Sequence, residues 1–90
     1  MTDLEAVKRN GFSLKYIKNQ TPEICLTAVK ENGWALEFVK EQTPEICIEA
    51  VKKDKAAVMY VNKKFDFLFQ KKFKKMNLKE IRAEVPELFL

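Results

Sequence analysis

Apolar and polar residues along this chain follow the spacing of amphipathic helices, and the pattern returns every 22 residues. The segment 20–25 reappears unchanged as segment 42–47. The apolar positions after each copy lie three and four residues apart, which is typical of one face of a helix. A fixed period of this kind is characteristic of repeat proteins, whose units bury their apolar faces against one another. The sequence therefore predicts an all-α fold, a short solenoid of stacked helical hairpins.

A threonine followed by a proline marks the start of the first helix in each hairpin. Thr21 suits the N-cap position, and Pro22 suits the first helical position. Thr43 and Pro44 repeat the pair. In the central hairpin we therefore expect a helix over about residues 22–32.

An Asn-Gly pair is expected to end this helix, because Gly33 can adopt the left-handed conformation at the C-terminus. A second, shorter helix is then expected over about residues 34–40. In the next hairpin the pair is replaced by Asp54 and Lys55. A left-handed lysine at that turn costs about 1 kcal/mol.

Three repeats are expected within a single domain over residues 1–90. Their approximate limits are residues 4–20, 21–42 and 43–61. The first repeat lacks most of its opening turn, so Asp3 or Thr2 is expected to cap its shortened helix.

Residues 62–90 depart from the repeat and are expected to form a capping region that closes the stack. Apolar residues at helical spacing in this region are Phe65, Leu68, Phe69, Phe73 and Met76. Asn77 is expected to cap a last helix that ends near Glu84.

The stretch from Thr21 to Val39, with its Thr-Pro-Glu start, Asn-Gly turn and Phe38-Val39 pair, resembles the repeat of a family called domain of unknown function 4116. The resemblance covers about residues 4–61 and departs from the pattern at the third turn. It implies tandem short helical hairpins, as in the bacterial, protist and large-virus proteins of that family. It implies no activity and assigns no catalytic residue.

Enzymatic chemistry is not indicated by the residues present. The chain has no histidine, which is the commonest general base and zinc ligand. Cys25 and Cys47 occupy the same repeat position, and we interpret both as small, reduced core residues. We therefore expect no enzyme, no cofactor and no metal site.

Aromatic residues also recur with the repeat. Tyr16, Phe38 and Tyr60 share one position, and Phe12 aligns with Trp34. Stacked aromatic rings beside lysines can bind single-stranded nucleic acid. We interpret the ladder instead as part of the core, because stacked hairpins bring equivalent side chains together.

Positive charge is concentrated in the second half of the chain. Residues 1–51 carry six basic and eight acidic side chains, whereas residues 52–82 carry eleven basic and three acidic ones. The candidate partner-binding residues of this basic block are Lys63, Lys64, Lys71, Lys72, Lys74 and Lys75. Such a block attracts an acidic protein surface or a polyanion, although a solvated helix face is an alternative interpretation. Arginine is scarce, which disfavours specific base recognition.

The most probable function from sequence alone is a non-enzymatic protein-interaction module, such as a small inhibitor or regulator that occludes a larger protein. The alternative is a nucleic-acid-binding protein that uses the basic block. A homodimer is expected, joined through an open end of the stack or through Leu88, Phe89 and Leu90. No signal peptide or membrane segment is predicted, so a cytoplasmic location is expected, in the protein's own cell or in a host cell.

Overall fold

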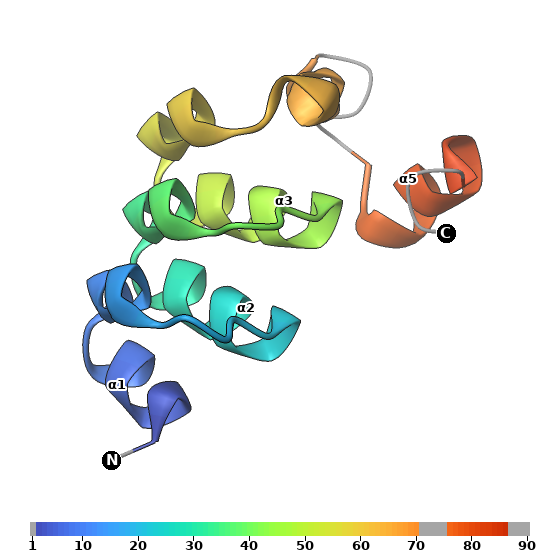
Figure 1. The fold of residues 1–90 in the computed structure, drawn as a ribbon. Helices are drawn as coiled ribbons and strands as arrows, with labels where there is room; N and C mark the ends of the chain where they lie inside the picture. Colours follow the sequence, from blue (N-terminus) through green and yellow to red (C-terminus); the bar gives the residue numbers. More distant parts are fainter. Residues whose placement is uncertain (1, 71–75, 87–90) are drawn as a thin grey trace.

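The computed structural model describes residues 2–70 and 76–86, and in this part of the chain it contains helices and no strand. Each hairpin pairs an α-helix with a 3₁₀-helix. The pairs are α1 (Asp3–Arg9) with η1 (Gly11–Tyr16), α2 (Pro22–Glu31) with η2 (Gly33–Phe38), and α3 (Pro44–Lys53) with η3 (Lys55–Tyr60). Figure 1 shows the three hairpins stacked one on the next, with the α-helices side by side. The predicted all-α hairpin stack is confirmed.

The predicted helix starts are also confirmed. The Thr21 hydroxyl accepts a hydrogen bond from Ile24 N at 3.2 Å, and the Thr43 hydroxyl accepts one from Ile46 N at the same distance. Thr2 caps the shortened α1 in the same way. Each cap satisfies a backbone N–H that the helix itself leaves without a partner.

The second helix of each hairpin differs from the prediction. It is a 3₁₀-helix in each case. In the central hairpin it begins at Gly33 and ends at Phe38, two residues earlier than expected. Asn32 serves both helices, because it ends α2 and its side chain accepts a hydrogen bond from Trp34 N at 3.0 Å. Asp54 does the same between α3 and η3. Only one residue separates the two helices, so the second helix starts directly after the first one ends.

The expected left-handed glycines were wrong, since the described residues include no positive φ angle. Gly11 and Gly33 are instead buried where η1 and η2 approach the next α-helix. A Cβ at Gly11 would lie 2.5 Å from the Ala28 carbonyl oxygen. Lys55 therefore has no left-handed penalty. Glycine is required at positions 11 and 33 for space rather than for backbone conformation.

In each of the two complete hairpins, a glutamine side chain forms hydrogen bonds with the backbone at the end of the 3₁₀-helix. Gln20 donates to the Phe38 carbonyl at 2.8 Å and accepts from Lys40 N at 3.0 Å. Gln42 donates to the Tyr60 carbonyl at 2.7 Å and accepts from Asn62 N at 2.7 Å. These bonds satisfy backbone groups at the end of each 3₁₀-helix. We call the two arrangements the glutamine clasps.

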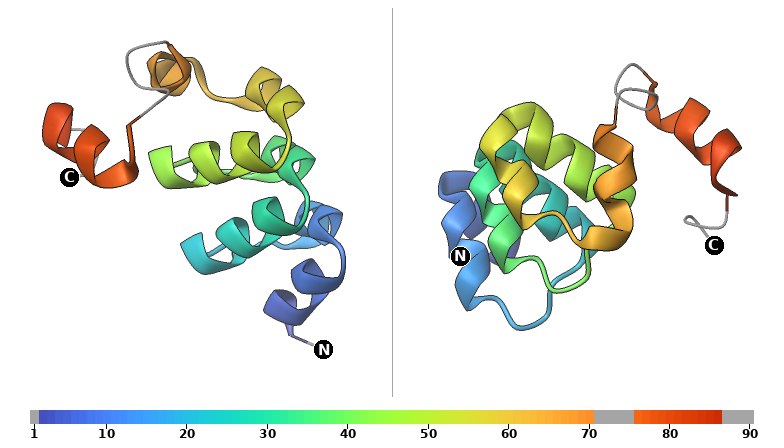
Figure 2. Two further views of the ribbon diagram at one scale, coloured as in Figure 1. Left: turned by 180° about the vertical axis from the view of Figure 1, so that it is seen from behind. Right: turned by 90° about the horizontal axis from the view of Figure 1, so that it is seen from above.

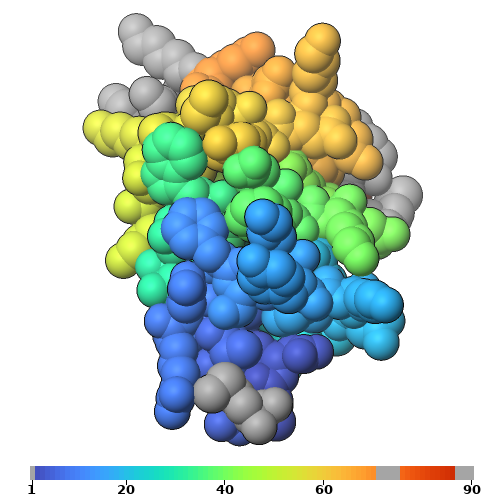
Figure 3. Space-filling model, turned by 60° about the vertical axis from the view of Figure 1, so that its left-hand side comes forward, coloured from blue at the N-terminus to red at the C-terminus, as the bar shows by residue number. Residues whose placement is uncertain are grey.

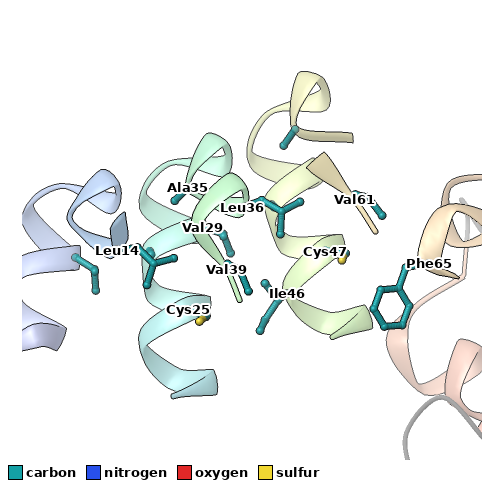
Figure 4. Close-up of a cluster of buried hydrophobic side chains, with 14 of the residues drawn as sticks. Leu14, Cys25, Val29, Ala35, Leu36, Val39, Ile46, Cys47, Val61 and Phe65 are labelled. Atoms are coloured by element: carbon teal, nitrogen blue, oxygen red, sulfur yellow. The ribbon is translucent and has the colours of Figure 1, made fainter. Parts of the chain in front are cut away.

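The core runs through the stack between the α-helices and the 3₁₀-helices, as Figure 4 shows. Its fully buried side chains include Leu14, Val29, Leu36 and Ile46. Ala28 and Ala50 are also 0% exposed, so their small size allows adjacent hairpins to approach closely.

The chain after Val61 forms η4 (Lys63–Phe69) and then α5 (Leu78–Glu84). Phe65 and Leu68 of η4 are buried, and Figure 4 shows Phe65 directed toward the last hairpin. The prediction for α5 is confirmed, because Asn77 and Glu80 cap each other reciprocally at its start. Figure 2 shows α5 to the side of the stack, next to α3. The predicted core residue Phe73 lies outside the described residues.

Candidate interaction surfaces

The two cysteines lie in the core, as predicted, and both thiols are free. The Cys47 thiol donates to Gln42 Oε1 at 3.3 Å, and the Cys25 thiol donates to Gln20 Oε1 at 3.5 Å. Burial raises the pKa of Cys25, and burial together with the nearby charge of Asp66 raises the pKa of Cys47 to about 12. Each thiol thus stays protonated and supports a glutamine clasp, which is a structural role.

Metal-binding geometry is absent from the described part of the chain, where no three Cys, Asp or Glu residues are grouped to hold an ion. The same part contains no helix long and apolar enough to cross a membrane. The features that distinguish the surface are apolar side chains exposed to solvent.

The most prominent of these features lies over the 3₁₀-helices. We define the aromatic face as Phe12, Tyr16, Trp34, Phe38 and Tyr60. Tyr16 is 81% exposed and Phe12 is 42% exposed, whereas the other three are partly buried. Figure 3 shows this side of the molecule, where η1 in blue, η2 in green and η3 in yellow follow one another.

The rings of the aromatic face contact one another between hairpins. Phe12 and Phe38 meet edge to face with centroids 6.1 Å apart, and Trp34 and Tyr60 do so at 5.8 Å. The Trp34 indole also donates to Asp54 Oδ2 at 2.6 Å, which fixes its orientation. A ring in one hairpin thus packs on the ring 26 positions later, in the next hairpin.

The prediction that the recurring aromatic residues belong to the core is wrong for Tyr16 and Phe12, which are both exposed. Phe38 and Tyr60 are covered because each receives a ring from the hairpin before it. Tyr16 belongs to the first hairpin, and among the described residues no ring precedes it in the stack. Position in the stack, rather than residue type, exposes this tyrosine.

One lysine side chain lies beside the exposed ring. The Lys15 ammonium is 5.8 Å from the Tyr16 ring centroid and 5.9 Å from the Phe38 centroid, within the range of cation–π attraction. This end of the aromatic face therefore combines apolar rings with positive charge.

The predicted basic block is only partly described. Lys63 and Lys64 are exposed on η4, and the Lys64 ammonium lies 5.1 Å from the Phe65 ring centroid. The other four predicted residues, Lys71, Lys72, Lys74 and Lys75, lie outside the described residues. So do the predicted self-association residues Leu88, Phe89 and Leu90.

A second surface is an apolar groove of about 660 Å³ between α3 and α5. Its apolar lining comes from four segments of the chain: Ile48 and Val51 of α3, Val58 of η3, Leu68 and Phe69 of η4, and Met76, Leu78 and Ile81 at α5. We call it the α3–α5 groove. Sequence reasoning missed it, because no periodic signal relates residues 76–81 to α3.

The comparison with known families agrees with this architecture. The profile of the Domain of unknown function (DUF4116) matches residues 4–43 and again residues 21–66. Overlapping matches are expected for tandem hairpins that are interchangeable in register. No curated protein and no solved structure matches the chain. Because the two matches together cover more than half of the 90 residues, the chain belongs to the DUF4116 family.

Proposed function

We propose that this protein is a non-enzymatic interaction module that binds a protein partner through the aromatic face. The observation that supports this proposal is the exposure of Tyr16, which is 81% accessible in the first hairpin of the stack. Tyrosine and tryptophan are enriched among the residues that dominate binding energy, because they offer large contact area for little loss of side-chain entropy.

The surroundings of Tyr16 favour binding with little rearrangement. Its backbone belongs to η1, which contacts η2 and α2, and Phe12 and Phe38 pack against each other beside it. A surface that is already ordered loses less conformational entropy when a partner binds.

The charge around the aromatic face favours a partner with an acidic surface. Lys15 lies over the rings, and Lys18 is exposed close by. Exposed Lys63 and Lys64 add positive charge at the other end of the stack. Charges of this kind chiefly accelerate encounter, so Lys63→Gln with Lys64→Gln should slow association while leaving the dissociation rate nearly unchanged.

A module that binds in this way would act as an inhibitor or regulator by covering a site on a larger protein. We also propose a homodimer, joined through an open end of the stack. Light scattering of the intact chain at tens of micromolar tests the dimer, and a monomer under those conditions would exclude it.

The second candidate function is binding of single-stranded nucleic acid. One observation favours it: an exposed tyrosine ring with a lysine ammonium beside it can stack a base and neutralise a phosphate. In that case the logarithm of affinity should fall with the logarithm of salt concentration by about 0.7 for each phosphate neutralised.

The test is affinity capture from native lysate with three proteins: the parent, Tyr16→Ala and the control Lys30→Ala, which changes an exposed residue of α2. We expect the parent and the control to recover one protein after nuclease treatment, and Tyr16→Ala to lose it. Recovery that disappears with nuclease would favour the second candidate. Equal recovery by Tyr16→Ala would exclude the aromatic face as the binding surface.

A further inference from the structure

The α3–α5 groove combines an apolar floor with an ordered row of charges. Glu45, Glu49 and Lys52 lie at helical spacing along the side of α3 that borders the groove, and Lys55 follows at the start of η3. From Glu45 to Lys52 the helix rises about 10 Å. The border of the groove is thus acidic at one end and basic at the other.

These charges remain available to a ligand. Glu49 and Lys52 are 3.7 Å apart, but the Lys52 side chain is 69% exposed and that of Glu49 is 28% exposed. An ion pair this exposed is weak, so a partner can replace it with pairs of its own. Glu45 and Lys55 are exposed as well.

Helix α2 has a similar charge order, but its charged residues Glu23 and Lys30 do not line the α3–α5 groove. Glu23 lies in its first turn and Lys30 in its last, and such charges stabilise a helix through its dipole. Dipole stabilisation therefore accounts for the charge order on both helices, and the apolar groove is what distinguishes α3. This difference makes α2 a matched internal control.

We propose that the α3–α5 groove binds an amphipathic helical segment of a protein partner, an inference that rests on the proposed protein-binding function. Apolar residues at positions i, i+3, i+4 and i+7 of the segment fill the groove. Its amino-terminal half is acidic and lies against Lys52 and Lys55. Its carboxy-terminal half is basic and lies against Glu45 and Glu49, so that the segment runs antiparallel to α3.

The probe is a fluorescein-labelled designed helical peptide with leucines at those positions, glutamates in its first half and lysines in its second. A second peptide of identical composition has its glutamates and lysines interspersed. Fluorescence anisotropy with the full chain should show that the segregated peptide binds about tenfold more tightly, as expected for a few exposed ion pairs acting together.

Three variants locate the binding. Val58→Asp alters a 44% exposed residue of the groove lining, so it should weaken both peptides at least tenfold while circular dichroism stays unchanged. Glu45→Gln with Lys52→Gln, the pair that occupies the repeat positions of Glu23 and Lys30, should remove the preference for the segregated peptide. The matched control, Glu23→Gln with Lys30→Gln on α2, should preserve it.

Several results would overturn the proposal. Failure of both peptides to bind would do so, as would equal affinity for the two peptides or indifference to Val58→Asp. Binding only after deletion of residues 87–90 would identify the chain's own C-terminal residues as the occupant instead.

Binding of the peptide by Tyr16→Ala, together with loss of lysate capture by that variant, would show that the groove and the aromatic face act separately. Failure at one surface can therefore be distinguished from failure at the other.

Discussion

Replacing Gly33 with alanine should destabilise the protein, although backbone considerations alone predict the opposite. The φ angle of Gly33 is not positive, so alanine can adopt the same backbone conformation. At such positions, replacing glycine with alanine typically stabilises by about 0.4–1 kcal/mol, because the unfolded chain loses freedom. If glycine served only to allow flexibility, Gly33→Ala would raise the free energy of unfolding.

The packing around Gly33 predicts a decrease in the free energy of unfolding instead. The added Cβ would clash with the Ala50 carbonyl oxygen, a backbone atom in α3, and would lie 3.2 Å from both the N and the Cβ of Asp54. Backbone atoms cannot rotate away, so η2 and α3 must separate. Overpacking of this kind costs about 1–3 kcal/mol, which exceeds the entropic gain. The expected net result is a loss of about 1–2 kcal/mol.

Urea denaturation followed by circular dichroism measures this loss. The control is Lys55→Ala, because Lys55 occupies the equivalent position of the third hairpin and is exposed. Its free energy of unfolding should change by less than about 0.5 kcal/mol. Gly11→Ala should behave like Gly33→Ala, since its Cβ would also meet a carbonyl oxygen, that of Ala28. A Gly33→Ala protein at least as stable as the parent would refute the close approach of the hairpins.

Three further predictions concern the clasps and the core. Gln42→Ala should lower the free energy of unfolding by about 1–3 kcal/mol, because the Tyr60 carbonyl and Asn62 N lose their partner; an unchanged urea midpoint would contradict this. Ala50→Leu should cost about 1–3 kcal/mol by overpacking, and a variant as stable as the parent would show that Ala50 has room around it. The pKa of the Cys47 thiol is raised from 9.0 to about 12, so the folded state favours the protonated thiol. The stability this provides is complete below pH 9 and is lost as the pH rises toward 12, and chemical denaturation across this range should show a shallower decline in Cys47→Ala.

The helix starts could be predicted from sequence because they depend on neighbouring residues. Thr21 with Ile24, and Asn77 with Glu80, contain both members of each capping interaction within one turn. Burial of the cysteines followed from their apolar neighbours in the repeat.

Features that depend on distant residues could not be predicted in this way. The glutamine clasps join residues 18 to 20 positions apart, and a lone glutamine in a turn carries no sign of its partner. The role of Gly33 was misjudged because a glycine after a helix suggests a left-handed cap, whereas the crowding comes from the next hairpin. The exposure of Tyr16 depends on its place in the first hairpin, which the shared repeat pattern does not reveal.

The aromatic face is the central claim, and photo-crosslinking from position 16 tests it most directly. Replacing Tyr16 with benzoylphenylalanine retains a large exposed aromatic group, and illumination in native lysate links it to whatever lies against it. As a control, the same group replaces Lys30 on α2. The account predicts one protein adduct from position 16 that survives nuclease treatment and is absent from position 30. No adduct from position 16, or the same adducts from both positions, would contradict it.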